Sequence, residues 1–321
     1  MGGGFAELPV HRYNAAMRYH AKQGGRTKRL PTEQRNAASR NLDRMTAREI
    51  VVLMNREDRK VARAVGREIP AIARAVDAIV RGILKGGRLF YVGAGSSGRM
   101  GVLDAAECKP TFGVSPKLVQ ALIAGGRRAV TGAVEGSEDS VRNAERDLRE
   151  KKLKRNDIVV AITASGTTPY VVAAMKFARS RGAMTVAITS NRHTPAARPA
   201  KIVIAPEVGP EVVTGSTRLK AGTVQKMVLN MLSTGAMARL GHVYENLMID
   251  LALTNQKLND RGLRILAEAS GKKLPAAEHA LRAAGHSMRA ALVMLKLGVD
   301  AREAKRLLAR AGGNLRKALG E

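Results

Sequence analysis

The sequence predicts an α/β fold, a doubly wound five-stranded parallel sheet followed by a small C-terminal helical domain. Five short apolar runs carry the strand prediction, each rich in Val, Ile or Leu: residues 88–93, 119–124, 158–163, 184–188 and 202–205. Runs of this length bounded by Gly, Pro, Asn or Asp are typical of parallel strands buried on both faces. Helical patterns alternate with them at about 59–85, 98–108, 138–152, 169–181 and 216–240, and this alternation indicates βα units with right-handed crossovers.

The chain beyond Gly241 shows helical patterns and no strand pattern. Short amphipathic helices are expected at 244–258, 261–269, 276–284, 288–297 and 301–311, with breaks at glycines. We therefore predict three parts: a basic, disordered extension at 1–31, an α/β domain with N-terminal helices at 32–259 and a small helical domain at 260–321. The last part lacks paired carboxylates, which favours a role in packing or interaction.

Composition restricts the classes of function. Lys and Arg number 55 against 27 Asp and Glu, a net charge of +28 that would attract nucleic acid. The cations are spread along the chain and aromatic residues make up 3%, so a solvated surface is favoured and nucleic-acid binding is not expected to be the main function. The single cysteine, Cys108, excludes an intrachain disulfide, and the chain has no apolar run that spans a membrane. A cytoplasmic location is expected.

The segment 209–226 combines hydroxyls, glycines and cations at the expected start of a helix. Free backbone N–H groups and the dipole at a helix N-terminus favour an anion. Thr and Ser also cap helices that bind no ligand, so a phosphate site and a capped core helix both remain open.

Two further loops place hydroxyls after predicted strands, where ligands bind in open α/β sheets. The first is Gly93-Ala-Gly-Ser-Ser-Gly98, and the second is Thr163-Ala-Ser-Gly-Thr-Thr-Pro169. The first fits a dinucleotide fingerprint, but the next strand ends in Gly and Arg instead of the acidic residue that binds a ribose. The paired serines therefore indicate a compact phosphate, with capping as the alternative for any single hydroxyl.

These motifs are similar to those of known protein families. Two such loops in a five-stranded unit resemble the sugar isomerase (SIS) domain of phosphosugar-binding proteins. Segment 209–226 is similar to the motif shared by N-acetylmuramic acid 6-phosphate etherases and the glucokinase regulatory protein. Further matches, over residues 30–321, are Thr32-Glu33 with Asn36, Gly93-Ala-Gly-Ser-Ser-Gly-Arg-Met-Gly101, Asp104-Ala-Ala-Glu-Cys108, Glu135-Gly-Ser-Glu-Asp139 and Asn246-Leu-Met-Ile-Asp250.

The resemblance implies an enzyme that cleaves the lactyl ether of N-acetylmuramic acid 6-phosphate in cell-wall recycling. D-lactate and N-acetylglucosamine 6-phosphate would be the products, by elimination and addition of water, without metal or cofactor. By motif match, the catalytic glutamates are Glu107 and Glu138. The phosphate would be bound by Ser96, Ser97, Ser165, Thr167 and Thr168, with Ser216, Arg218 and Lys220 lining the same crevice. A homodimer is also implied.

Local context suggests which glutamate is the base. Glu138 follows Ser137, an expected N-cap, so a helix dipole would stabilise its carboxylate. Glu107 lies near the end of its helix, where the dipole disfavours the anion and suits a proton donor. Dipoles contribute about 0.3–1 kcal/mol, so burial is expected to supply the rest of the pKa shift.

Two other functions compete with the etherase. A non-catalytic sugar-phosphate sensor, like the glucokinase regulatory protein, would be expected to have two such domains in tandem, and one fits here. A phosphosugar isomerase would remove the same C2 proton and leave the ether oxygen in place.

Overall fold

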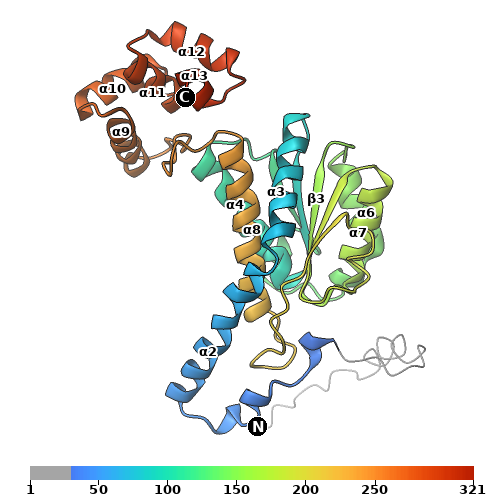
Figure 1. Ribbon diagram of the computed structural model, residues 1–321. Coiled ribbons are helices and arrows are strands. Elements are labelled where there is room, and N and C mark those ends of the chain that lie inside the picture. Colours follow the sequence, from blue (N-terminus) through green and yellow to red (C-terminus); the bar gives the residue numbers. More distant parts are fainter. Residues whose placement is uncertain (1–29) are drawn as a thin grey trace, which may run out of the picture.

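The computed structural model describes residues 30–321, so the extension predicted for 1–31 lies almost wholly outside the described residues. Within that range, five parallel strands form one sheet in the order β2-β1-β3-β4-β5 (Figure 1). Their bounds are β1 Leu89–Gly93, β2 Val119–Ile123, β3 Ile158–Ile162, β4 Met184–Ile188 and β5 Ile202–Ile204. The predicted strands are confirmed to within one residue at each end.

Both faces of the sheet are covered, which explains the continuous apolar strands. In β1, Tyr91 belongs to a core shared with one helical layer and Phe90 to a core shared with the other. The helices α3 (Ile69–Leu84), α4 (Gly95–Phe112) and α8 (Lys220–Arg239) contribute to the first core, and α6 (Val141–Glu150) and α7 (Pro169–Ser180) to the second. Leu89 pairs with Val119 on one side and with Ile158 on the other, so β1 lies inside the sheet.

The helix predicted at 59–85 is wrong as a single element. Helix α2 covers Ala47–Gly66 and α3 begins at Ile69, with Pro70 in its first turn. A capping box of Thr46 and Glu49 starts α2 well before residue 59. Figure 1 shows α2 projecting from the sheet, at the end of the molecule opposite the C-terminal helices.

The C-terminal helices form a domain with its own apolar core. They are α9 Gln256–Ser270, α10 Leu274–Ala283, α11 Met288–Leu297, α12 Ala301–Arg310 and α13 Leu315–Leu319. The helix predicted at 244–258 is wrong, because a Tyr244–Leu247 bridge and turns occupy most of that segment. The connection is tied to the α/β domain where Ala252 N donates to Pro110 O at 3.2 Å. No helix among residues 30–321 is long and apolar enough to cross a membrane.

Candidate functional site

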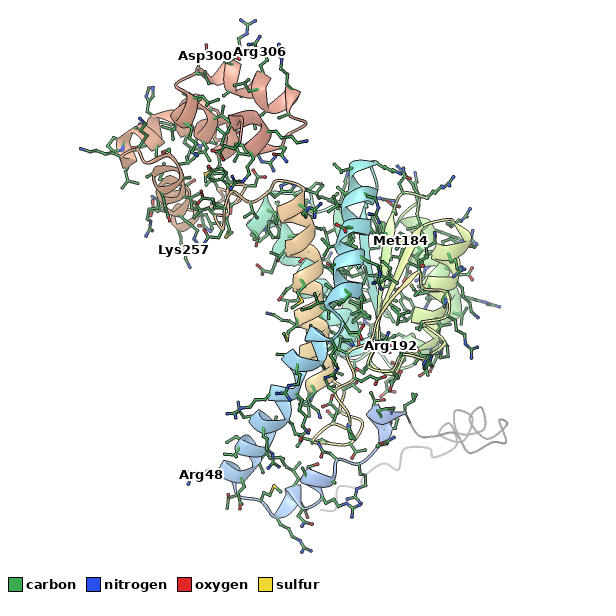
Figure 2. The ribbon with its side chains drawn as sticks, in the orientation of Figure 1. Arg48, Met184, Arg192, Lys257, Asp300 and Arg306 are labelled. Atoms are coloured by element: carbon green, nitrogen blue, oxygen red, sulfur yellow. The ribbon has the colours of Figure 1, made fainter. Side chains whose placement is uncertain are left out.

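The carboxyl edge of the sheet gathers the starts of three helices. Met184 and Arg192 lie toward opposite ends of the sheet along β4, and Arg192 marks the carboxyl edge (Figure 2). Helix α4 follows β1 and α7 follows β3 at this edge. Helix α8 runs parallel to α4. Residues midway along α8 donate to Asp104 of α4, and both helices end close to Asp250, which packs against Gly113 after α4 and bonds to His242 after α8.

The first serine loop is fixed by glycines that allow the helix to approach the sheet closely. A Cβ on Gly93 would lie 2.7 Å from the backbone N of Gly98, so a larger residue would displace α4. Ser96 and Ser97 stand in the first turn of α4, half-buried, and no described residue hydrogen-bonds to either hydroxyl. The N-cap, Ala94, offers no side-chain acceptor. Free N–H groups and free hydroxyls thus coincide, as an anion site requires.

Residues that follow β4 hold the second loop in position. Asn191 Nδ2 donates to the carbonyls of Ala164 and Ser165 at 3.1 and 3.3 Å. Gly166 has a φ of +76°, and a Cβ there would lie 2.3 Å from Thr194 Oγ1. This packing fixes the backbone that presents the hydroxyls.

The three hydroxyls of this loop that are predicted to bind phosphate have different hydrogen-bond partners. Ser165 and Thr167 share a hydrogen bond of 2.9 Å between their hydroxyls, and Thr168 bonds to Thr163 at 3.2 Å. Thr168 is the N-cap of α7 without a side-chain cap bond. The capping alternative therefore does not explain Thr168, and the first N–H groups of α7 receive no cap from it.

Glu138 lies above the end of β2. A Cβ on Gly125 would come within 2.9 Å of Val134 Cβ, so the glycine lets the segment before Glu138 fold back over the strand. The glutamate is exposed in a single 3₁₀ turn, Ser137–Asp139, that packs against α7.

The expectation that Ser137 caps the helix after Glu138 is wrong. Helix α6 begins at Val141 and Ser140 is its N-cap, accepting from Asn143 N at 3.3 Å. The Ser137 hydroxyl instead donates to Val134 O at 2.7 Å. Glu138 therefore lies before the helix. The predicted effect of a helix dipole on its carboxylate thus no longer supports its role as base.

Glu107 is exposed on α4, not buried as its expected role as acid requires. It lies about 12 residues beyond Gly95, which places it about 18 Å along the helix axis from the first serine loop. One chain therefore presents Glu107 far from the serines, which lie at the carboxyl edge with Glu138.

The first N–H groups of α8 bind a carboxylate of the chain itself. Glu211 accepts from Lys220 N at 3.0 Å and from Ala221 N at 2.9 Å, so a carboxylate caps the helix predicted to bind phosphate. Burial raises the pKa of Glu211, against the lowering effect of these two N–H groups. Ser216 is half-buried and Arg218 exposed, and neither side chain bonds to another described residue.

Lys220 is engaged in a buried ion pair. Its ammonium bonds to Glu57 Oε2 at 2.7 Å and to Val208 O at 3.0 Å, with side-chain exposures of 1% for Lys220 and 2% for Glu57. Burial acts to raise the pKa of Glu57, but hydrogen bonds from Lys220, Lys60 and Asn36 outweigh it and lower the pKa to about 2. This geometry gives Lys220 a structural role, and its predicted contact with substrate stays a prediction.

Two residues that hold the site in place were not predicted to belong to it. Arg99 donates to Val130 O at 3.1 Å and to Gly132 O at 2.7 Å, tying α4 to the segment that leads to Glu138. The buried carboxylate of Asp104 accepts from Tyr91, Asn230 and Ser233 at 2.8 to 3.0 Å. Both residues belong to quoted motifs, but sequence alone does not show which partners they meet.

Burial, with the nearby carboxylates of Asp104 and Glu107, raises the pKa of the Cys108 thiol to about 12, which leaves it an unreactive packing residue. Among residues 30–321, no three His, Cys, Asp or Glu side chains are placed to hold a metal ion.

Two descriptions of SIS domains match overlapping parts of the chain. The family description of the glucokinase regulatory protein N-terminal SIS domain matches residues 71–179, and that of the SIS domain matches residues 140–235. A solved structure of a putative phosphosugar isomerase from Bacteroides fragilis is 24% identical with a TM-score of 0.44, covering 59% of this chain and 90% of that one.

Curated relatives are much closer in sequence. The chain is 49% identical to the N-acetylmuramic acid 6-phosphate etherase of Clostridium beijerinckii, covering 92% of this chain and 97% of the relative. It is 51% identical to the etherase of that name from Serratia proteamaculans, covering 90% and 98%. Half of the residues thus agree over nearly the whole length of both proteins. The chain belongs to the N-acetylmuramic acid 6-phosphate etherase family.

Proposed function

We propose that this chain cleaves the lactyl ether of N-acetylmuramic acid 6-phosphate, releasing D-lactate and forming N-acetylglucosamine 6-phosphate, and that it acts in the cytoplasm on sugars recovered from the cell wall. The observation that carries the proposal is the identity of about half the residues to etherases across nearly their full length. The two uncapped helix starts at the carboxyl edge, with the hydroxyls of Ser96 and Thr168, supply a place for the 6-phosphate.

The reaction needs a base and an acid. In the open-chain sugar the C2 proton lies next to the C1 aldehyde, so a carboxylate can remove it and the resulting enolate expels the C3 lactate. Water then adds at C3. Glu138 lies at the carboxyl edge beside α7, where the phosphate loops also lie, and it is the proposed base. Glu107 is the proposed acid, which protonates the departing lactate oxygen.

Exchange of the C2 proton separates the two roles. In deuterated water, Glu107→Gln is expected to exchange the C2 proton while releasing little lactate, because the base is intact and the leaving group lacks its acid. Glu138→Gln is expected to lose both exchange and lactate release. The reverse pattern would exchange the two assignments, and full activity in both variants would remove these glutamates from the mechanism.

The position of Glu107 argues for a site shared between two copies. Helix α4 carries Glu107 about 18 Å from its serine end. A two-fold axis perpendicular to α4 would set the helices of two copies antiparallel, which brings Glu107 of one copy toward the serine end of the other. The apolar side chains of Leu103 on α4, 50% exposed, and Met231 on α8, 38% exposed, offer a surface for this contact. Burial by the second copy would also supply the desolvation that Glu107 lacks alone.

Mixing two inactive variants tests the shared site. If each site takes Glu107 from one copy and Glu138 from the other, subunit exchange between Glu107→Gln and Glu138→Gln restores about one quarter of the activity, since half of the dimers carry one intact site. If one chain supplies both residues, mixing restores nothing. Sedimentation of the unmixed protein checks that it is a dimer, and a monomer with full activity would contradict the proposal.

A further inference from the structure

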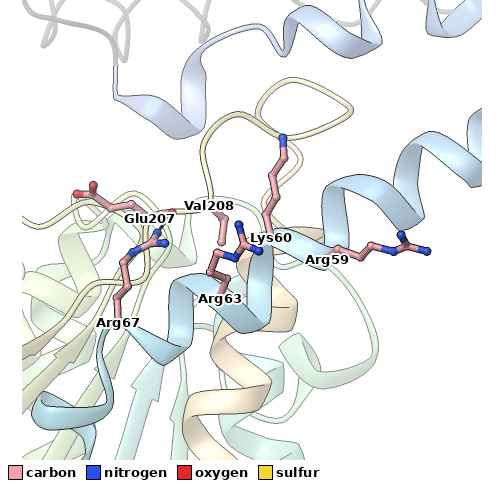
Figure 3. Close-up of a pocket in the computed structure, with 6 residues that line it drawn as sticks. All are labelled: Arg59, Lys60, Arg63, Arg67, Glu207 and Val208. Carbon is pink, nitrogen blue, oxygen red and sulfur yellow. Dashed lines mark hydrogen bonds between the residues drawn. The ribbon is translucent and has the colours of Figure 1, made fainter.

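A concentration of positive charge lies at the C-terminal end of α2, beside the segment that follows β5. Arg59, Lys60, Arg63 and Arg67, with Glu207 and Val208, line a hollow of about 330 Å³. Figure 3 shows Arg63 and Arg67 beside Val208, with Lys60 extending past them and the Arg59 side chain directed away from the other three. The volume falls at the lower end of the range for sites that bind small molecules.

The guanidinium groups in this hollow lack acidic partners. Among the described residues, no carboxylate forms an ion pair with Arg59, Arg63 or Arg67. Lys60 pairs at 2.6 Å with Glu57, a carboxylate that it shares with Lys220, and the Glu207 carboxylate points away from the hollow in Figure 3. The net charge facing the hollow is therefore strongly positive.

The spacing of the arginines makes this arrangement unfavourable without an anion. Arg59, Arg63 and Arg67 follow one another at i,i+4, so each faces the next on the same side of the helix. Like charges at this spacing destabilise a helix, whereas Glu or Asp would stabilise it. A bound anion between neighbouring guanidiniums would reverse the sign of the interaction.

The walls of the hollow are held in position by bonds to the loop before α8. Arg67 donates to Glu207 O at 3.3 Å, and the buried ammonium of Lys220 donates to Val208 O at 3.0 Å. Because Lys220 is itself paired with Glu57 of α2, helix and loop are fixed to each other. The helix and the loop that wall the hollow are thus fixed without a ligand, whereas the side chains of Arg59 and Arg63 are exposed and would be ordered by the anion they bind.

We propose that this hollow binds a small molecule that carries a diphosphate group, at a site separate from the phosphosugar crevice. Neighbouring arginines of the series stand about 6 Å apart along the helix axis, so two linked phosphates can each meet a guanidinium. Planar guanidiniums bind phosphate oxygens in pairs, which favours phosphate over a spherical anion. Val208 adds an apolar side chain to the lining of the hollow.

The test uses inorganic pyrophosphate as probe, titrated calorimetrically into the full chain at about 0.1 M salt, where long-range attraction is screened. We expect saturable binding of one pyrophosphate per chain and weaker binding of inorganic phosphate. Arg59→Gln/Arg63→Gln should weaken pyrophosphate binding at least about tenfold, because two charged hydrogen-bonding groups are lost.

The matched control is Arg48→Gln/Arg56→Gln. Both of these arginines are exposed on α2 and line no part of the hollow, and Figure 2 shows Arg48 at the far end of the helix. This control removes the same charge and should change pyrophosphate affinity by less than about twofold. Absence of saturable binding, equal weakening in both double variants, or phosphate binding as tight as pyrophosphate would each overturn the proposal.

Activity measurements keep this proposal distinct from the etherase proposal. Pyrophosphate at a separate site should leave the KM for N-acetylmuramic acid 6-phosphate unchanged, and simple competition with that substrate would overturn the separate site. Binding of pyrophosphate is measured without substrate, so its result stands whether or not lactate is released.

Discussion

Replacing Lys220 by methionine removes the ammonium from a buried ion pair and keeps most of the side-chain volume. The partners are 2.7 Å apart with exposures of 1% and 2%. Losing one member of such a pair costs about 3–5 kcal/mol, since the other charge stays buried. Glu57 retains bonds from Lys60 and Asn36, so we expect the lower end, about 3 kcal/mol. Urea unfolding followed by circular dichroism measures the loss.

Two further variants test whether the loss of stability comes from breaking the ion pair between Lys220 and Glu57. Lys60→Met removes the other cation on Glu57, but its side chain is 56% exposed, so we expect a loss below about 1 kcal/mol. In the Glu57→Gln background, Lys220→Met should cost much less than in the wild type. A loss below about 1 kcal/mol for Lys220→Met, together with a raised KM, would refute this reasoning and favour the substrate contact predicted from sequence.

Three other perturbations follow from the same structure. The pKa of Glu57 falls from its usual 4.5 to about 2 on folding, so its carboxylate contributes about 3 kcal/mol to the free energy of unfolding. This contribution is complete above pH 4.5 and is lost as the pH falls toward 2. When unfolding is measured against pH, the Glu57→Gln variant should lack this pH-dependent loss of stability. Gly166→Ala forces a Cβ to 2.3 Å from Thr194 at a φ of +76°, so we expect about 1–3 kcal/mol of destabilisation by urea unfolding and a higher KM, and an unchanged KM would contradict the placement of the phosphate loop. Arg99→Ala frees the segment before Glu138, so kcat should fall about tenfold or more with little change in Tm, and an unaltered kcat would show that Arg99 does not position the base.

Periodicity and composition predicted the sheet well because its strands are buried on both faces. Apolar runs with clear boundaries gave all five strands within a residue at each end. Helix limits were less predictable. The start of α2 depends on the pairing of Thr46 with Glu49, and the break before α3 depends on Pro70, which suits either a first turn or an interruption.

The helix predicted at 244–258 was wrong for a different reason. Its apolar residues, such as Ile249 and Leu251, face the core of the C-terminal domain without helical backbone. A pattern of burial does not by itself specify the backbone that achieves it.

For the site, sequence patterns located the loops but not the distances between them. The serine loops follow strands, and strand ends meet at one edge, so their convergence was predictable. Ionic partners from distant segments were not predictable. Lys220 meets Glu57 across 163 positions of sequence, and the N–H groups of α8 meet Glu211. The distance between Glu107 and the serines could be stated only once the structure showed that one continuous helix, α4, carries both.

Incubation of the purified chain with N-acetylmuramic acid 6-phosphate in heavy-oxygen water tests the central claim most directly. Elimination and addition of water predict release of D-lactate and one heavy oxygen at C3 of N-acetylglucosamine 6-phosphate, detected by mass spectrometry of both products. An isomerase or a sensor would release no lactate. Absence of lactate, or lactate release without the label at C3, would contradict the account.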